Sequence, residues 1–484
     1  MNYKENNKIT HSNKNNFSWM AILIAIIALV VGLSSLNDSS MGIYRYFPYV
    51  TISFGVITLF FFHVYREMTW VSMLTIVFMV LRYIVSLIIL RHDHYPLGIY
   101  HIVVDNTKSL TTALIMFYEI LMIYSALYVG KKTYKNSITI DKYKENLLGK
   151  KNFSRLNVLI VFMILITIII FMVYPSLFNN YSFIVNTNLE NLTDKIVESQ
   201  SGLPSGMRWI GYTLGEITRY VVLEYLLLKL YKRYSNKGAI YSRYWWLSIS
   251  LASINAIITN QRMMLGIFMS LTFFYQIYQL YPSKRKFFAV FGAIIAIIGA
   301  TIITLTYWSN ALTYQSSSQM IQGYTNGFYN IYQASAAYEN ASMRLFEKIE
   351  MFFIGDGLGN INILSMFING TNSSDIYNYY IYGRIFNGGA VMPLVSQMSF
   401  YFSGIFGPIF SFICILWAKK LENRSLTSNG NIMIMQFCAF VFSATPFMYN
   451  YSTLIHILTI VALPLLICSY INSKKIVVGK FSGI

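Results

Sequence analysis

Charged residues are scarce in this sequence. Only 12% of its 484 residues are charged, against about 25% in an ordinary soluble domain. Cysteine is scarce too, and because Cys414, Cys438 and Cys468 all lie in apolar runs, no extracellular disulfide framework is indicated. The apolar runs also lack the alternation of apolar and polar residues that a membrane β-barrel needs, which excludes an outer-membrane barrel.

What the chain has instead is a succession of apolar runs, each about 20 residues long. Hydrophobic residues make up 55% of it, and the mean hydropathy is +0.49. Once a barrel is excluded, helices are the structure that satisfies the backbone inside lipid. We therefore predict an all-α polytopic integral membrane protein, with residues 1–484 forming a single membrane domain.

Basic residues outnumber acidic ones, 37 against 19, giving a net charge of +18. Most of them fall in short loops on one side of the apolar runs, which is the positive-inside pattern and argues against a nucleic-acid partner. The most basic loop, residues 130–155, is predicted to be cytoplasmic. Both termini lie on the same side as this loop, and the first apolar run lacks a cleavage site, so we expect it to be retained. About twelve spans follow from this pattern, at residues 20–36, 47–64, 70–90, 110–129, 156–174, 209–231, 244–259, 263–281, 287–307, 393–417, 432–449 and 454–471.

One long segment, residues 308–392, interrupts the apolar runs. It is rich in Tyr, Asn, Ser and Gly, and the topology makes it an extracytoplasmic loop between the ninth and tenth spans. Within it, residues 338–353 are predicted to form an amphipathic helix that Gly355 and Gly357 stop. Such a helix suits a segment that lies against the membrane surface or one that caps a cavity. We expect much of the function to reside in this loop.

Five charged residues inside predicted spans need an explanation. A lone charge facing lipid at mid-bilayer costs roughly 2.5 to 3.5 kcal/mol, so each should face protein or water. Glu216 and Arg219 are three residues apart on one helix and can pair, and Arg82 can pair with Glu119 on the neighbouring span. Glu224 is expected to be a structural residue as well.

Several arginines are expected on the extracytoplasmic side, where an anionic ligand could bind. Arg262 sits in the turn of a tight helical pair, and Arg384 is flanked by glycines that let the backbone approach a ligand. Arg208 and Arg219 point to the same side. For Arg262, snorkelling to lipid headgroups is the alternative to an anion site, and for Arg384 it is a solvated loop.

Other signals in the sequence are discounted. Residues 355–359 (GDGLG) resemble a phosphate-binding loop but lack its lysine and follow a helix. His92, Asp93 and His94 offer metal-ligand types without a metal-site spacing. We predict no metal and no cofactor.

A combination of short motifs gives the chain a family likeness. The motifs are residues 260–266 (NQRMMLG), 353–359 (FIGDGLG) and 388–393 (GGAVMP), the last running on to 406–408 (FGP). With many spans and a long late outer loop, this pattern resembles the Wzy-type oligosaccharide repeat-unit polymerases of O-antigen and capsular polysaccharide synthesis. The resemblance implies a glycosyltransferase of the cytoplasmic membrane that polymerises polyprenyl-diphosphate-linked repeat units at the outer face, with a flippase and a chain-length regulator as possible partners. Family polymerases often carry an acidic residue after the Gly-Gly entry, where this chain has Ser396 and Gln397.

The expected reaction is attack of a sugar hydroxyl on an anomeric carbon, with polyprenyl diphosphate leaving. Fixed guanidinium groups can stabilise the negative charge that develops on the leaving diphosphate without a metal. We assign this role to Arg262 and Arg384, with Arg219 or Arg208. A loop carboxylate accepts the hydroxyl proton, with Asp356, Glu339 and Asp375 as candidates and Asp356 preferred.

Further contacts to the substrate are expected from the outer loop. Arg344 lies on the predicted amphipathic helix, where a ligand contact and a surface ion pair are both open. Tyr379, Tyr380 and Tyr382 can stack on sugar faces or can anchor the membrane interface.

Two other functions remain open at this point. A flippase or transporter would suit many spans with buried charges, although transporters usually show internal repeats, which this sequence lacks. A ligase that transfers sugar to another acceptor would share the topology. The resemblance to O-antigen ligases is weaker, because they carry a His in the long loop and residues 308–392 contain none.

Overall fold

A computed structural model gives the fold of the chain. It describes residues 17–38, 40–95, 105–132, 153–180, 182–183, 205–237, 242–259, 263–285, 287, 321–323, 325–341, 343–361, 364, 371–382, 392–427 and 431–473. The described residues are helical apart from turns and one pair of two-residue strands, so the all-α fold class is confirmed. The predicted ninth span and most of the basic 130–155 loop lie outside the described residues.

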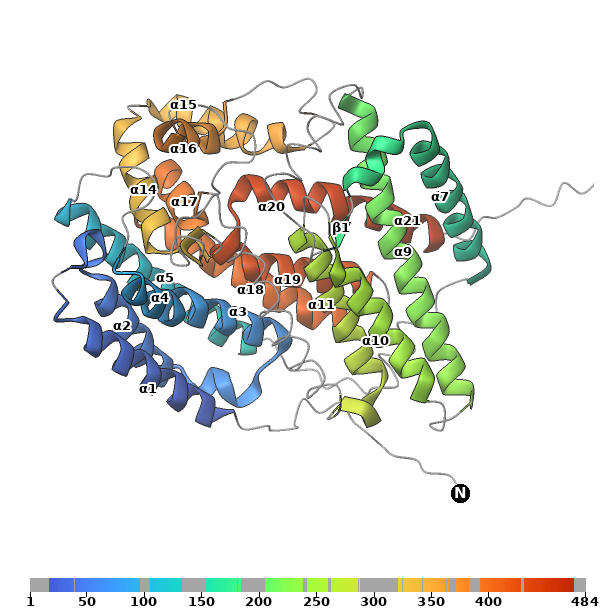
Figure 1. The fold of residues 1–484 in the computed structure, drawn as a ribbon, viewed down its shortest axis with the longest axis horizontal. Coiled ribbons are helices and arrows are strands. Elements are labelled where there is room, and N and C mark those ends of the chain that lie inside the picture. The colour runs from blue at the N-terminus through green and yellow to red at the C-terminus, as the bar shows by residue number, and fades with distance from the viewer. Residues whose placement is uncertain are drawn as a thin grey trace, which may run out of the picture. The chain divides into compact units, whose positions relative to one another are not determined.

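Figure 1 shows the helices and strands of the described residues. The elements of the first part are α1 Ser18–Ser35, η1 Gly42–Tyr44, α2 Phe47–Phe60, η2 Phe62–Glu67, α3 Trp70–Val80, η3 Leu81–Val85, α4 Ser86–His92 and α5 Asn106–Lys132. Those of the middle part are α7 Phe153–Val173, η4 Pro175–Asn180, β1 Ser182–Phe183, α9 Ser205–Lys237, α10 Ser242–Ile257, β2 Ile258–Thr259, α11 Met263–Leu280 and η6 Pro282–Lys284. The last part contains α14 Phe328–Asn340, α15 Leu345–Glu350, η7 Met351–Gly355, η8 Leu358–Asn360, α16 Ser373–Tyr382, α17 Leu394–Phe402, α18 Gly407–Thr427, α19 Ile432–Met448, α20 Tyr451–Ile457, η10 Leu458–Ala462 and α21 Leu463–Ser473.

Long apolar helices are present as the sequence indicated. Among the described residues, four are long and apolar enough to cross a membrane: Ser18–Ser35, Trp70–His92, Asn106–Lys131 and Tyr451–Tyr470. Three shorter apolar helices, Val158–Val173, Leu265–Leu280 and Ile432–Met448, accompany them. These helices make the chain a membrane-associated all-α protein.

The chain folds into two compact units, each described by itself. Unit 1 contains residues 1–137, 289–424 and 436–458, and unit 2 contains residues 138–288, 425–435 and 459–484. The described part of the predicted outer loop belongs to unit 1.

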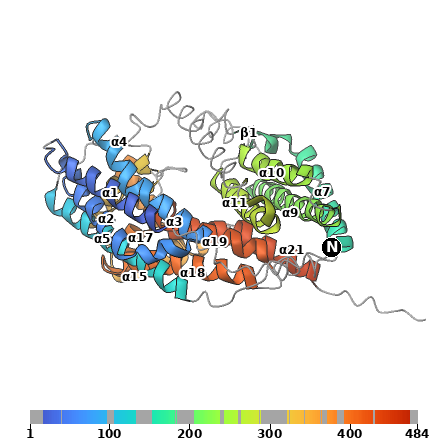
Figure 2. The same ribbon diagram turned by 90° about the horizontal axis from the view of Figure 1, so that it is seen from below.

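Helices α1 and α2 of unit 1 pack closely because small residues line their contact (Figures 1 and 2). The buried residues of α1 are Ala21, Ala25, Ala28, Gly32 and Ser35. A Cβ at Gly32 would lie 3.0 Å from the Pro48 carbonyl oxygen, and one at Gly55 would lie 3.0 Å from the Ala25 carbonyl oxygen. The early part of α1 therefore faces the late part of α2, in an antiparallel pair whose backbones approach as in membrane helix pairs.

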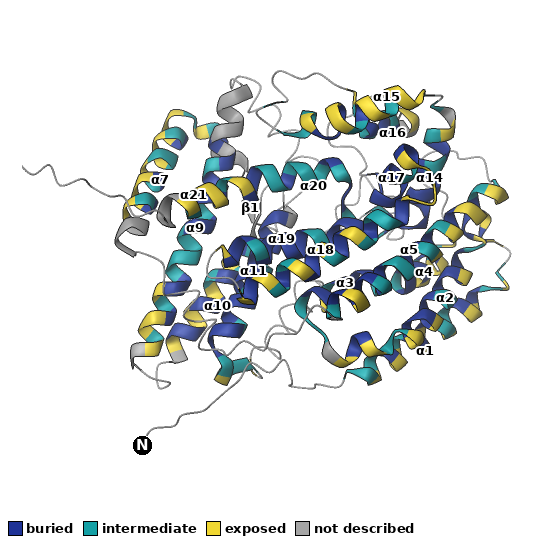
Figure 3. Cartoon of the chain, turned by 180° about the vertical axis from the view of Figure 1, so that it is seen from behind, coloured by how far each residue is buried: buried dark blue, intermediate teal, exposed yellow. Residues whose placement is uncertain are grey.

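Exposed residues lie along several helices (Figure 3), and many of them are large and apolar. On α1 the exposed side chains include Trp19, Ile22, Leu23, Ile26, Val30 and Leu33, and on α7 they include Val158, Val161, Phe162, Leu165, Ile169 and Met172. Soluble proteins rarely expose contiguous apolar patches of this kind, which mark membrane or protein contact sites. In helices of membrane-spanning composition, such faces fit contact with lipid.

The predicted tenth span, residues 393–417, is not one helix. Helix α17 ends at Phe402, and α18 begins at Gly407. Ser403 has a φ of 81°, a left-handed conformation that no α-helix continues through. The prediction of one helix through this run was wrong, and Ser403, Gly404, Gly407 and Pro408 interrupt the apolar sequence where the helix breaks.

The predicted amphipathic helix at residues 338–353 is also divided. Its first residues complete α14, which ends at Asn340, and a new helix, α15, starts after Arg344 in extended conformation. The continuation of α15 is the π-helical turn η7, which ends at Gly355. The stop at this glycine agrees with the prediction, but the start does not.

Unit 2 is built on helices α7, α9, α10 and α11. The hydroxyls of Thr167 and Thr218 share a hydrogen bond of 2.9 Å that joins α7 to α9. Asn255 on α10 donates to the Gly266 carbonyl at 3.0 Å on α11. The strands β1 and β2 form a short antiparallel pair in which Ser182 faces Thr259.

Candidate functional site

Two of the three residues predicted to be catalytic, Arg262 and Arg384, lie outside the described residues. Arg208 stands in the first turn of α9, and Tyr382 is the last residue of α16, but their side chains are likewise outside the description. For these four positions, only their places along the chain are available.

Arg219 is engaged within its own helix. Its Nη2 donates to Glu216 Oε2 at 2.9 Å and to the Tyr220 hydroxyl at 3.3 Å. The guanidinium also lies over the Tyr220 ring, 5.1 Å from its centroid. The predicted pairing of Glu216 with Arg219 is therefore confirmed, and part of the charge of Arg219 is already balanced by its neighbour.

Two further predicted contact residues lie at the surface of unit 1. Arg344 is exposed at the start of α15, where Glu347 Oε2 accepts its backbone N–H at 2.9 Å instead of forming an ion pair with its guanidinium. Tyr380 is 40% exposed on α16 and remains accessible.

Asp356, the third predicted catalytic residue, is fully buried. Its Oδ1 accepts the Ser373 backbone N–H at 3.1 Å. Its Oδ2 accepts three more donors: the Ser373 hydroxyl at 2.5 Å, Gln397 Nε2 at 2.7 Å and the Tyr401 hydroxyl at 2.5 Å. Hydrogen bonds to a charged group contribute about 1.5 to 3 kcal/mol each, so this arrangement holds a carboxylate without a cation. No ion pair to Asp356 occurs among the ion pairs of the described ranges.

A second layer of bonds extends this site to the helix that follows. Gln397 Oε1 accepts the Tyr451 backbone N–H at 2.7 Å, and its Nε2 also reaches the Ser452 hydroxyl at 3.2 Å. These contacts are with the first turn of α20. We call Asp356, Ser373, Gln397, Tyr401 and Ser452 the Asp356 hub. It ties the turn after η7 to the starts of α16 and α20 and to one face of α17.

Glycines shape the turn that carries Asp356. A Cβ at Gly355 would overlap the Thr371 carbonyl, and one at Gly357 would overlap the Phe353 carbonyl. The backbone N–H of Asp356 donates to the Met351 carbonyl at 2.7 Å, which closes the π-helical turn. The GDGLG motif therefore serves close backbone approach, which directs the Asp356 carboxylate inward.

Aromatic rings surround the hub. Tyr338 stacks on Phe400 with centroids 3.9 Å apart, and Phe352 stacks on Tyr451 at 4.8 Å. Burial, together with the neighbouring Tyr401 and the Asp356 carboxylate, raises the pKa of Tyr338 well above its usual value, so its hydroxyl stays protonated. Its hydroxyl donates to the Met392 sulfur. This packing joins α14 to Met392, before α17, and to Phe400, near the end of α17.

A second buried charged group lies within predicted spans. Arg82 and Glu119 are both fully buried, and Arg82 Nη2 lies 3.1 Å from Glu119 Oε2. Glu119 also accepts the Ser411 hydroxyl at 2.7 Å, and Arg82 Nη1 donates to the Pro446 carbonyl at 3.3 Å. The prediction that Arg82 meets Glu119 is confirmed. Arg82 lies in the π-helical turn η3, so a local change of helix type accompanies the buried charge.

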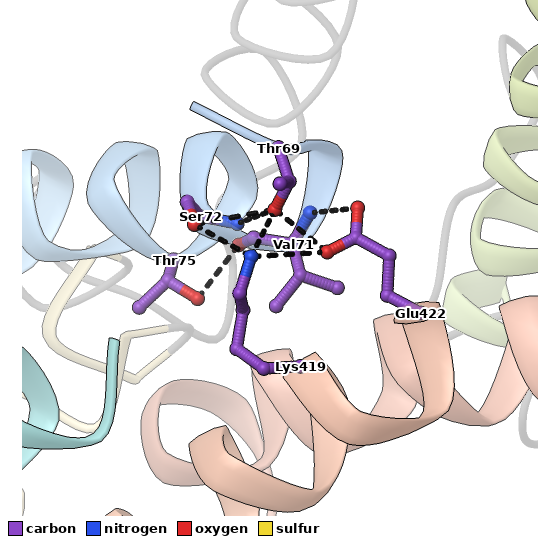
Figure 4. A network of polar contacts seen from close by, with 6 residues as sticks. All are labelled: Thr69, Val71, Ser72, Thr75, Lys419 and Glu422. Carbon is purple, nitrogen blue, oxygen red and sulfur yellow. Dashed lines mark hydrogen bonds and ion pairs between the residues drawn. The ribbon is translucent and has the colours of Figure 1, made fainter. Parts of the chain in front are cut away.

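A third polar group, at the start of α3, is shown in Figure 4. Glu422 on α18 accepts the Val71 backbone N–H at 3.2 Å and the Thr69 hydroxyl at 2.6 Å. Lys419, one turn earlier, lies 3.3 Å from Glu422 and donates to the Ser72 hydroxyl at 3.2 Å. Glu422 and Thr69 thus cap the N-terminus of α3, where a carboxylate complements the unpaired N–H groups.

Sequence reasoning missed the partners of Asp356. Gln397 and Tyr401 are four residues apart on α17 and so share one helix face. This spacing is the signal that could have found them. Ser373 carried no comparable signal, because a Ser in a Ser- and Asn-rich stretch reads as a surface residue.

Comparisons with known proteins add no relative. The chain matches no protein-family model, no curated protein and no solved structure.

Proposed function

We propose that this chain joins polyprenyl-diphosphate-linked oligosaccharide repeat units into a polysaccharide at the outer face of the cytoplasmic membrane. In this proposal the chain has about twelve spans, both termini are cytoplasmic, and residues 308–392 lie outside. The resemblance to Wzy-type polymerases in residues 260–266, 353–359 and 388–393 motivates it, and the membrane-spanning length of four described helices supports its setting.

The observation that carries the proposal is the bonding of Asp356 to the two helices that flank Arg384 in the sequence. Helix α16 ends at Tyr382 and α17 begins at Leu394, so Arg384 lies in the short connection between them. Both helices are bound to Asp356, through Ser373 on the first and Gln397 on the second. Asp356 thereby fixes α16 relative to α17, and we propose that this framework helps to position the guanidinium of Arg384.

The proposed reaction is a glycosyl transfer without a metal. A hydroxyl oxygen of one lipid-linked unit forms a bond to the anomeric carbon of another glycan, and the bond from that carbon to the diphosphate oxygen breaks. The leaving polyprenyl diphosphate keeps the electron pair. Arg262 and Arg384, with Arg208 or Arg219, stabilise its negative charge through charge-assisted hydrogen bonds. The accessible Tyr380, with Tyr382 and Arg344, contributes to binding of the glycan.

The role of Asp356 changes in light of its surroundings. Its two oxygens already accept four hydrogen bonds and are shut off from solvent, so we assign it to positioning instead of proton transfer. The hydroxyl proton is then accepted by a more accessible carboxylate. Glu339 is 61% exposed and pairs with Lys108 at 2.8 Å, and Asp375 lies in the first turn of α16. Both remain candidates.

The test uses the cells that make the polysaccharide. With the chain replaced by the Arg262→Ala or Arg384→Ala variant, at equal amounts in the membrane, we expect single repeat units in place of long polymer. The matched control is Arg66→Ala, which removes an exposed arginine from the predicted inner turn and should leave polymer length unchanged. Normal polymer in both test variants would refute the arginine assignment.

The transporter alternative is favoured by one observation, the buried pair of Arg82 and Glu119. Intramembrane ionisable residues often mark transport pathways. Reconstituted protein that moves lipid-linked oligosaccharide between leaflets but forms no polymer would support this alternative. A ladder of polymer lengths from the purified protein would support the polymerase, and a single transfer to a different acceptor would indicate a ligase.

A further inference from the structure

The short helix α15 and the turn η7 carry large apolar side chains that the protein leaves uncovered. Leu345 is 69% exposed, Phe346 77%, Ile349 46% and Phe353 61%. These residues lie outside the four helices of membrane-spanning length. In a segment bathed by water, four such side chains on one side would be costly.

The residues that face the protein include the one lysine of this helix. Lys348 donates to the Phe400 carbonyl at 3.1 Å, and its ammonium lies 4.5 Å from the centroid of the Phe400 ring. Met351 is buried beside Phe400, and Phe352 packs against Tyr401. The lysine therefore points toward the protein while the large apolar side chains point away from it, which is not the arrangement of a helix that faces water alone.

The remaining positions give the segment a third side. With 3.6 residues per turn, Leu345, Phe346, Ile349 and Phe353 gather on one side of the helix, and Glu347 and Glu350 follow on the adjoining side. Both glutamates are exposed. The three sides thus face protein, an apolar environment and water, which is the division expected of a helix at a membrane interface.

The apolar side continues into a second exposed apolar group. At the break between α17 and α18, Phe402 is 40% exposed, Ile405 70% and Phe406 50%. Phe352 connects the two groups, because its ring lies 5.0 Å from that of Phe353 and 5.1 Å from that of Phe402.

We infer that the apolar side of α15 and η7 lies in the outer leaflet of the bilayer and holds the outer loop against the membrane. We assign lipid as the occupant because the apolar side continues into the exposed apolar residues Phe402, Ile405 and Phe406, which lie inside a predicted span. The adjoining side, with Glu347 and Glu350, remains exposed to water. This inference does not depend on the proposed enzymatic activity. An amphipathic helix in this loop was expected either to lie against the membrane surface or to cap a cavity. The inference favours membrane contact for α15 and η7.

The test is a depth measurement with spin labels on the full chain in vesicles of phosphatidylethanolamine and phosphatidylglycerol. Labels are attached through Phe346→Cys and, separately, Ile349→Cys, with Glu350→Cys as the matched control. Cys468 is replaced by Ser in all three, and Cys414 and Cys438 are buried. We expect the labels at 346 and 349 to collide more with oxygen than with a water-soluble nickel chelate, and the label at 350 to show the opposite preference.

Two results would overturn the inference. Collisions with the nickel chelate as frequent at 346 and 349 as at 350 would place the apolar side in water. Labels at 346 and 349 that meet neither reagent, with spin–spin broadening between chains, would show that a second copy of the protein covers it.

Discussion

Replacing Asp356 with Asn tests whether the hub is built as described. The change keeps the size of the side chain but turns one acceptor oxygen into a donor. If the amide nitrogen takes the place of Oδ2, it meets the donors of Ser373, Gln397 and Tyr401, and if it takes the place of Oδ1, it meets the Ser373 backbone N–H. At least one bond is lost either way.

The expected loss of stability follows from the number of bonds. The amide should turn so that only the Ser373 N–H loses its acceptor, because its oxygen then still accepts from the Ser373 hydroxyl, Gln397 and Tyr401. One bond to a charged group contributes about 1.5 to 3 kcal/mol, and the other three bonds weaken because the acceptor is now neutral. We therefore expect Asp356→Asn to destabilise unit 1 by about 2 to 4 kcal/mol, and Asp356→Ala to destabilise it more, because all four donors lose their bond to the carboxylate.

Thermal unfolding in detergent, followed by the fraction that remains monodisperse after heating, measures the effect. The matched control is Glu350→Gln, which removes one carboxylate charge from an exposed position and should change stability by no more than about 0.5 kcal/mol. If Asp356→Asn unfolds at the same temperature as the wild type and the control, the four hydrogen bonds do not hold a charged carboxylate, and the hub as described is wrong.

Three further predictions concern the packing and the other buried charges. Glu119→Gln should destabilise the protein by about 3 to 5 kcal/mol, because Arg82 stays buried without its counter-charge, and the double change Arg82→Met with Glu119→Leu should recover much of this loss in the same heating assay. Gly55→Leu should destabilise the protein by about 1 to 3 kcal/mol, because the new Cβ would press against α1. Cysteine crosslinks between α1 and α2 should then form less readily than in the control variant Gly404→Leu, in which the new Cβ would meet nothing within 4 Å. Glu422→Gln should weaken the cap on α3 by about 0.5 to 2 kcal/mol, seen as faster hydrogen exchange at its first turn with unchanged exchange in α5.

The sequence predicted the features that depend on long stretches or on strong energetic penalties. The runs at 70–90 and 110–129 became α3 to α4 and α5, because an apolar run of this length has few other stable structures. The pairing of Arg82 with Glu119 was predictable because a lone charge in such a run is too costly to leave without a partner.

The features that were not predicted depend on single backbone positions and on contacts between distant residues. The break between α17 and α18 depends on the positive φ of Ser403, which hydropathy does not reveal, although Gly404, Gly407 and Pro408 are turn signals at this place. Asp356 stands in a glycine-rich loop and so reads as an exposed carboxylate. Its burial depends on Gln397 and Tyr401, more than forty residues later, so only the tertiary structure could show it. The side chains of Arg262 and Arg384 lie outside the described residues, and their roles stay predictions.

The choice of a carboxylate at the centre of the hub bears on what the hub is for. A well-packed apolar residue would serve stability about as well, because burying a charge has a large desolvation cost. A carboxylate adds directionality, because each of its oxygens accepts hydrogen bonds in preferred directions. Ser373 and Gln397 can therefore both bond to Asp356 in only one relative position of α16 and α17. That relative position fixes the start of α16 against the face of α17 that carries Gln397 and Tyr401. Because Asp356 is fully buried and its oxygens already accept four hydrogen bonds, it is better understood as the residue that holds these helices in register than as a proton acceptor.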